Sequence, residues 1–217
     1  MNFTVSYTIW VLLSSFFVIG VLFLIFWTPE KGKSQIITYP DLIKESATTP
    51  PASITVMSYN IAFGAGLDNL KGRAQSKDVI MANLDKIKAQ VLTHNPDILA
   101  VQEIDRYSYR SYFIDQVEYL AKACGYPYVA VVTTWDKLWV PFPVTWDIRR
   151  HFGRVIASQA VFSKYPITDY QYDIYAKPAS NSVFYNFFYL DRAAQFCTIR
   201  LAPQLKIGLS NVHLEAY

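Results

Sequence analysis

The chain has 217 residues, enough for one sizeable domain and a shorter additional segment. Its 20 basic and 17 acidic residues leave a net charge of only +3, which is compatible with phosphate binding but gives no sign of a basic nucleic-acid stripe. The two cysteines fit no metal-binding spacing and cannot build a disulfide framework.

The N-terminal segment has the composition of a membrane helix. Residues 1–29 contain no charged side chain, and residues 9–27 are almost continuously apolar. At about 1.5 Å per residue, this stretch is long enough to span a bilayer. A cleaved signal peptide would need a basic start and a small-residue cleavage site, and both are missing. A buried core helix is the other alternative, but we predict an uncleaved single-pass transmembrane anchor over 1–29.

The segment after the anchor bears on orientation and on domain organisation. Lys31, Lys33 and Lys44 follow the apolar stretch and no basic residue precedes it, so the positive-inside rule places the body on the cytoplasmic side. Residues 30–52 show no sustained apolar period and contain two consecutive prolines, which is typical of a linker. The folded body is therefore expected over 53–217.

The first half of the body alternates strands with helices. A strand over 53–60 ends on Asn60, and a second strand over 97–103 ends on Glu103. Between them, apolar residues at i, i+4, i+7 and i+11 predict an amphipathic helix, namely Ile80, Leu84, Ile87 and Val91. A second amphipathic helix is expected before Gly125, and another strand over 128–134.

Residues 135–152 differ in composition from the rest of the body. They hold three of the five tryptophans, interleaved with prolines and followed by two arginines and a histidine. An ordered loop packed by its own aromatic rings is one interpretation. A wall of a substrate site and a membrane-facing patch are the others.

The second half of the body predicts short strands at about 154–163, 169–177, 193–201 and 205–214, which completes a layered α/β pattern. The last of these strands delivers Asn211, His213 and Glu215 at its end. Polar groups at the ends of three apolar strands suggest one shared cleft, because burying them unpaired in a core is costly.

Asn60, Glu103 and His213 could still be unrelated: a capping amide, a surface carboxylate and a buried histidine with its hydrogen bonds satisfied. If they meet, a carboxylate beside an amide suits a hard cation such as Mg²⁺, which takes oxygen ligands and keeps waters. A neighbouring imidazole can contact a phosphate or a developing oxyanion. This combination indicates metal-assisted phosphoester hydrolysis.

Four motifs occur in the order of a known family. They are MSYNI at 57–61, NPDILAVQE at 95–103 followed by Asp105 and Arg106, AVFSKYPI at 160–167, and NVHLEA at 211–216. In these motifs the chain resembles the endonuclease/exonuclease/phosphatase family over 54–217, and within it a bacterial membrane-anchored subgroup. The resemblance implies a four-layer α/β sandwich, with two packed mixed sheets flanked by helices.

The resemblance also implies roles for single residues. Glu103 would be the metal-binding carboxylate for Mg²⁺ or Mn²⁺, with Asn60 orienting the metal or the scissile phosphate. His213 would be the catalytic histidine that bonds the phosphate and helps the leaving group. Arg192 lies where family members often carry an arginine, without an assigned role.

Two further motifs of the family, Asp-x-Asn and a terminal Asp-His pair, have no counterpart before Tyr217. The sequence therefore resembles the first two-thirds of such an enzyme, with a C-terminally incomplete domain. We expect a membrane-anchored, Mg²⁺-dependent phosphoesterase, inactive as an isolated chain, to which a separately encoded C-terminal part is a possible partner. The alternative is a catalytically dead remnant that acts as a membrane-tethered binding module. A lipid headgroup, a nucleic acid and a small phosphoester all remain open as substrates.

Overall fold

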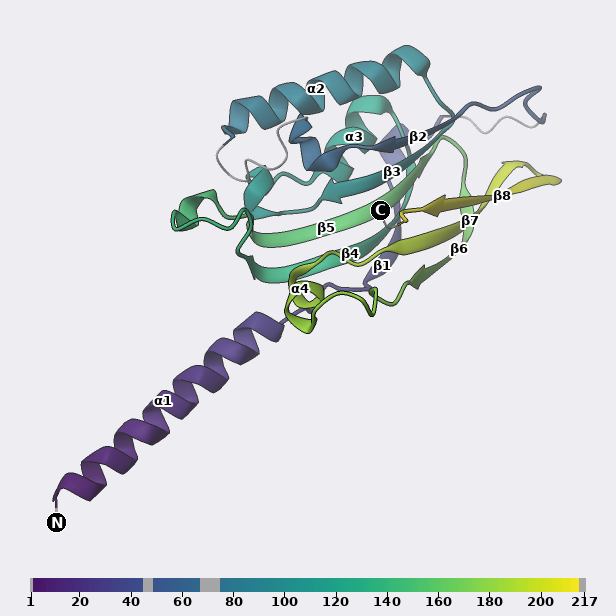
Figure 1. Cartoon of the computed structure of the whole chain (residues 1–217). Coiled ribbons are helices and arrows are strands. Elements are labelled where there is room, and N and C mark those ends of the chain that lie inside the picture. Colours follow the sequence, from purple (N-terminus) through teal and green to yellow (C-terminus); the bar gives the residue numbers. More distant parts are fainter. Residues whose placement is uncertain (1, 45–48, 67–74, 215–217) are drawn as a thin grey trace.

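The computed structural model describes residues 2–44, 49–66 and 75–214, which fold as helices and two sheets (Figure 1). The helices are α1 Asn2–Phe26, α2 Lys77–His94, α3 Gln116–Cys124 and α4 Val183–Phe188. The strands are β1 Ser34–Thr38, β2 Val56–Asn60, β3 Ile98–Asp105, β4 Tyr128–Val140, β5 Gly153–Ser163, β6 Ile167–Ile174, β7 Ala193–Ala202 and β8 Leu205–Val212.

The larger sheet has five strands in the order β1-β4-β5-β3-β2, and α2 and α3 cover one of its faces (Figure 1). It is mixed, because β2 runs parallel to β3 while the other neighbours are antiparallel. The Ser76 hydroxyl caps α2 by accepting from the Val79 backbone N–H. The apolar stripe predicted for this helix is confirmed, since its four residues are buried against the sheet: Ile80, Leu84, Ile87 and Val91.

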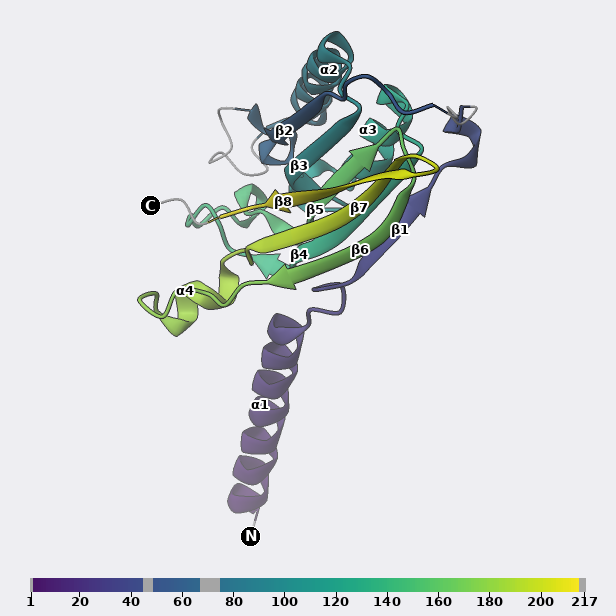
Figure 2. The same cartoon turned by 90° about the vertical axis from the view of Figure 1, so that its right-hand side faces the viewer.

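The smaller sheet has three antiparallel strands in the order β6-β7-β8 and packs on the other face of the larger one (Figure 2). Ile98 and Val161 of the larger sheet share a buried cluster with Ile199 of the smaller one. Two packed sheets with helices on the outside confirm the predicted α/β class.

Two details of the predicted sandwich are wrong for the described residues. The second sheet is purely antiparallel and not mixed. Its outer face carries no helix among residues 2–44, 49–66 and 75–214, so three layers form where four were expected. The alternating exposure of β6 fits this arrangement, because one face of the strand meets solvent.

The N-terminal segment forms one continuous helix, α1, whose described side chains are exposed. The sequence predicted that residues 9–27 would span a membrane. Within the described part of the chain, no helix is long and apolar enough to cross a membrane. The helix is therefore confirmed, and its membrane-spanning property is not supported.

The segment 30–52, expected to be a linker, contains the short strand β1. Its five residues pair with β4 at the edge of the larger sheet. The Glu30 backbone N–H also donates to the Asp136 carboxylate at 2.7 Å. Five residues are too few to give a periodic signal, so the pairing depends on the edge that β4 offers and not on a pattern in the segment itself.

Candidate active site

The three strand ends meet at one end of the gap between the two sheets. Asn60 is the last residue of β2, Glu103 lies near the end of β3, and His213 follows β8. His213 Nε2 lies 3.3 Å from Glu103 Oε1, and the Asn60 side chain also hydrogen-bonds the Glu103 carboxylate. The residues predicted to share a cleft are therefore brought together. Residues 215–217, at the end of the last motif, lie outside the described residues.

A β-bulge directs Glu103 into this cleft. The pairing of β3 with β5 shifts between Val101, opposite Ala160, and Ile104, opposite Ser158, so two residues of β3 face one residue of β5. Glu103 has a φ of 55°, a left-handed conformation that is costly for a residue with a Cβ. Backbone strain of this kind often marks functional positions. No sequence pattern predicted this bulge.

The surroundings of Glu103 favour its ionised form. Burial by itself raises the pKa of Glu103, because a charged carboxylate loses hydration. Hydrogen bonds from His213 and Asn60, with the positive charge of Arg110, outweigh burial and hold the pKa below its usual value. Glu103 is thus a carboxylate at neutral pH, which is the form that a hard cation requires.

His213 faces two groups that make opposite demands on one nitrogen. Its Nε2 contacts both the Glu103 carboxylate, which needs a donor, and the Arg192 guanidinium, which needs an acceptor. One ring nitrogen cannot serve both at once. An anion with several acceptor oxygens, placed between Arg192 and a protonated His213, would satisfy both donors.

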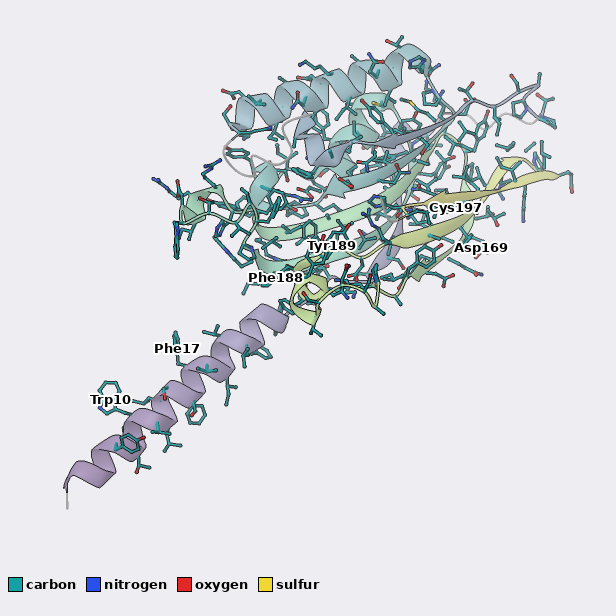
Figure 3. All side chains as sticks on the ribbon, in the orientation of Figure 1. Trp10, Phe17, Asp169, Phe188, Tyr189 and Cys197 are labelled. Atoms are coloured by element: carbon teal, nitrogen blue, oxygen red, sulfur yellow. The ribbon has the colours of Figure 1, made fainter. Side chains whose placement is uncertain are left out.

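Arg192 itself is held in place by Tyr189, whose hydroxyl accepts from the guanidinium at 3.0 Å. Tyr189 follows α4 and lies beside Phe188 at the base of the smaller sheet (Figure 3). The sequence assigns no role to Arg192 and does not single out Tyr189. An aromatic residue three positions before an arginine gives no signal for the contact between them.

Buried amides join the two sheets behind the cleft. The Asn211 amide nitrogen donates to the carbonyls of Val101 and Ala160 and to the Gln195 side chain. Gln102 donates to Asn211 Oδ1 at 2.6 Å, and Gln159 donates to the Asn211 carbonyl at 2.6 Å. This network fixes the end of β8, two residues before His213.

A pocket of about 590 Å³ opens beside Glu103 and His213. Most of the side chains that line it are apolar or aromatic: Phe63, Trp135, Val140, Pro141, Phe142, Val144, Phe152, Tyr185, Phe188, Tyr189 and Leu190. Several come from the tryptophan-rich segment 135–152, which contributes the end of β4 and the loop after it. Of the three interpretations of that segment, the wall of a site agrees best with this placement.

Arg110 lies in the wall of the pocket with its charge compensated. Its guanidinium donates to both carboxylate oxygens of Asp105, at 3.0 and 2.8 Å, and both side chains are buried. The guanidinium carbon lies 3.6 Å from the centroid of the Phe63 ring. This buried pair braces the pocket, and the charge of Arg110 makes a small contribution to the lowered pKa of Glu103.

The described residues fit a divalent cation bound mainly through water. Glu103 offers carboxylate oxygens, with the Asn60 amide beside it, while Asn60 Oδ1 accepts from the Ala62 backbone N–H at 3.0 Å. No group of three or more His, Cys, Asp or Glu side chains that could hold a metal occurs among residues 2–44, 49–66 and 75–214. Mg²⁺ can bind through a single carboxylate and keep water molecules as most of its other ligands.

The structure is thus an α/β protein with two packed sheets and a carboxylate, an imidazole and a guanidinium in contact at the strand ends. A family model described as the endonuclease/exonuclease/phosphatase family matches residues 57–196. The chain belongs to this family.

Individual relatives match parts of the chain. The 3'-5'-exoribonuclease subunit Ccr4 of the CCR4-Not complex from Emericella nidulans is 31% identical over 80 residues, 36% of this chain and 12% of that protein. A crystal structure of an endonuclease/exonuclease/phosphatase from Beutenbergia cavernae has a TM-score of 0.50 at 21% identity, covering 74% of this chain and 38% of that one. A family protein from Leptotrichia buccalis has a TM-score of 0.46 at 13% identity, covering 75% of this chain and 55% of that one.

The chain thus spans between about a tenth and about half of the length of these relatives. The likeness to the Beutenbergia cavernae structure supports the fold. The comparisons give no support to the narrower prediction of a membrane-anchored bacterial subgroup.

Proposed function

We propose that the chain carries the metal and phosphate half-site of a divalent-metal-dependent phosphoesterase. The observation that carries this proposal is His213 Nε2, 3.3 Å from the Glu103 carboxylate and in contact with the Arg192 guanidinium. A phosphate placed there meets two donors on one side and the carboxylate that would hold a cation on the other. Family membership supports phosphoester hydrolysis as the reaction class.

Each residue has a distinct part in this proposal. Glu103 would hold Mg²⁺ or Mn²⁺, with Asn60 orienting the carboxylate, and a bound ion would polarise a phosphoryl oxygen. Arg192 binds a non-bridging oxygen, as guanidinium groups do for phosphates. His213 donates a hydrogen bond from its ring N–H to a phosphate oxygen, where it stabilises the negative charge that develops as the ester bond breaks.

Metal binding can be tested without turnover. Mn²⁺ titrated into the 217-residue chain and followed by electron paramagnetic resonance should show binding that Glu103→Gln weakens by at least about tenfold, since the amide removes the anionic ligand. Glu118→Gln is the matched control, because Glu118 pairs with Lys122 on the exposed face of α3. Equal Mn²⁺ affinity in the wild type and Glu103→Gln would overturn the proposed metal site.

Hydrolysis is the second measurement. The rate of cleavage of bis(4-nitrophenyl) phosphate should be followed with Mg²⁺ and with chelator, for the chain alone and together with the C-terminal part of a related enzyme. Metal-dependent cleavage that is lost in Glu103→Gln and His213→Ala supports the phosphoesterase. Metal and phosphate binding with no cleavage in either form would favour the alternative of a binding module.

The proposal of a membrane location rests on the sequence and on the exposed apolar surface of α1. Trp10 and Phe17 project from this helix into solvent (Figure 3), and a large exposed apolar surface is typical of membrane or protein contacts. We propose attachment to a membrane through this helix, with the body on the cytoplasmic side. The chain should then sediment with membranes, whereas recovery in the soluble fraction without detergent would contradict the proposal.

A further inference from the structure

The pocket beside the cleft is continuous with the proposed phosphate position. Glu103 and His213 are both part of its lining, so a group esterified to a phosphate at His213 extends directly into it. Its volume of about 590 Å³ lies within the range of pockets that enclose small molecules. The shape of the pocket therefore bears on which phosphoester the site accepts.

The interior is built from aromatic rings that contact one another edge to face. Phe152 is at the centre, with ring centroids 5.5 Å from Phe63, 5.3 Å from Phe142 and 6.3 Å from Trp135. The Trp135 indole nitrogen is turned away and donates to the Phe188 carbonyl at 3.0 Å. The rings thus present carbon surfaces to an occupant, and such surfaces favour another ring beyond simple burial of area.

Charge separates the interior from the mouth. The guanidinium of Arg110 in the wall is neutralised by two hydrogen bonds to Asp105. Glu103 and His213 form a polar pair in the lining, and His213 contacts Arg192 outside it; we take this polar end as the mouth of the pocket. A phosphate is therefore held at the mouth, because burying its charge among the rings would be costly.

We propose that this pocket receives an aromatic group esterified to the phosphate, so that the substrates are aryl phosphoesters. This inference rests on the proposed function, since it takes the phosphate to lie at His213. A sugar-phosphate backbone offers hydroxyls and charges that the aromatic walls cannot satisfy. Selectivity for the aromatic group then comes from the walls, and binding of the phosphate comes from the residues at the mouth.

The experiment compares esters with the same phosphate and different attached groups. Dissociation constants of 2-naphthyl phosphate, decyl phosphate and methyl phosphate are measured by calorimetry on the 217-residue chain with Mg²⁺ present. We expect 2-naphthyl phosphate to bind at least about tenfold more tightly than methyl phosphate, and more tightly than decyl phosphate. Phe142→Ala should reduce the naphthyl preference at least about threefold and leave methyl phosphate binding unchanged.

Phe196→Ala on β7 is the matched control, since Phe196 is 42% exposed and Phe142 40%, and Phe196 is not part of the pocket. Equal affinity for the naphthyl and methyl esters would overturn the aryl assignment alone, as would tighter binding of decyl phosphate. The aryl assignment would also be overturned if Phe142→Ala and Phe196→Ala reduced the preference for the naphthyl ester by the same factor. Failure of every phosphate ester to bind would overturn the proposed function together with this inference.

Discussion

The side-chain amide of Gln102 donates to Asn211 Oδ1 at 2.6 Å, and this buried hydrogen bond ties the larger sheet to the smaller one directly behind the cleft. Gln102 immediately precedes Glu103, and Asn211 comes two residues before His213. The hydrogen bond therefore links the backbones that carry the two halves of the site. Buried hydrogen bonds of this kind favour a single arrangement of the elements they join.

Replacing Asn211 should loosen that link. Asn211→Leu removes the side-chain hydrogen bonds that Asn211 makes to both sheets. The Gln195 side-chain oxygen then loses a buried donor, and Gln102 keeps its longer contact, 3.3 Å, with the Ser58 hydroxyl. We expect the free energy of unfolding to fall by about 2–4 kcal/mol, measured by urea denaturation. Ser210→Ala, at an exposed neighbouring position on β8, should change it by less than about 0.5 kcal/mol. If the free energy of unfolding falls by a similarly small amount in both variants, the amide network does not hold the sheets together.

The left-handed backbone at Glu103 leads to a second prediction. Two substitutions of Glu103 should differ in stability but have the same effect on metal binding. Glycine adopts a φ of 55° without steric cost, whereas alanine keeps the strain. Glu103→Gly should therefore be more stable than Glu103→Ala by about 1 kcal/mol in thermal or urea unfolding, while both lose metal binding equally. An alanine variant as stable as the glycine variant would mean that the bulge relaxes once the carboxylate is gone.

Asp191 connects the wall of the pocket to the segment before β1. Its carboxylate pairs with Lys31 at 2.9 Å and with Lys177 at 3.4 Å, and Asp191 itself is buried. Asp191→Asn leaves the half-buried Lys177 beside a neutral amide. The free energy of unfolding should therefore fall by about 1–3 kcal/mol. Asp147→Asn removes only an exposed pair with Arg149 and should cost less than about 0.5 kcal/mol. The free energy of unfolding of both variants is measured by urea denaturation. An equal decrease in the two variants would contradict the bridging role of Asp191.

Two features of the structure could be predicted from the sequence alone. The stripe Ile80, Leu84, Ile87 and Val91 predicted α2 correctly, because burial of one helix face follows from spacing along the chain. The convergence of Asn60, Glu103 and His213 was also predictable, since polar residues ended three apolar strands. Those signals are local to each element.

The rest depends on contacts between distant segments. The pairing of β1 with β4 requires an edge that forms about 90 residues later in the chain, and the bulge at Glu103 depends on β5. The contact of Arg192 with Tyr189 and His213 forms only after β7 and β8 have paired. No periodicity in the sequence encodes such pairings, which are decided by tertiary packing.

Lys137 provides a prediction about pH. Burial, together with the nearby charges of Lys177 and Lys31, lowers the pKa of Lys137 from 10.5 to about 8, although Asp191 and Asp136 act in the opposite direction. Its ammonium lies 4.0 Å from the centroid of the Phe187 ring. In the unfolded chain this lysine keeps its proton up to about pH 10.5, whereas in the folded chain it loses the proton above about pH 8. Between these two values the unfolded state binds more protons, so this residue makes the fold more stable as pH rises.

Lys137→Met should accordingly stabilise the protein at pH 7 by about 1–2 kcal/mol, because it removes a charge that folding must desolvate and keeps a similar apolar stem. The advantage over the wild type should be constant below about pH 8 and shrink towards zero as pH approaches 10.5. The free energy of unfolding, measured for both proteins in urea at several pH values, gives this difference directly. Lys206→Met, at an exposed position on β8, controls for the loss of one positive charge and should show no such dependence. A stability difference between Lys137→Met and the wild type that stays the same from pH 7 to pH 10 would contradict the lowered pKa of Lys137.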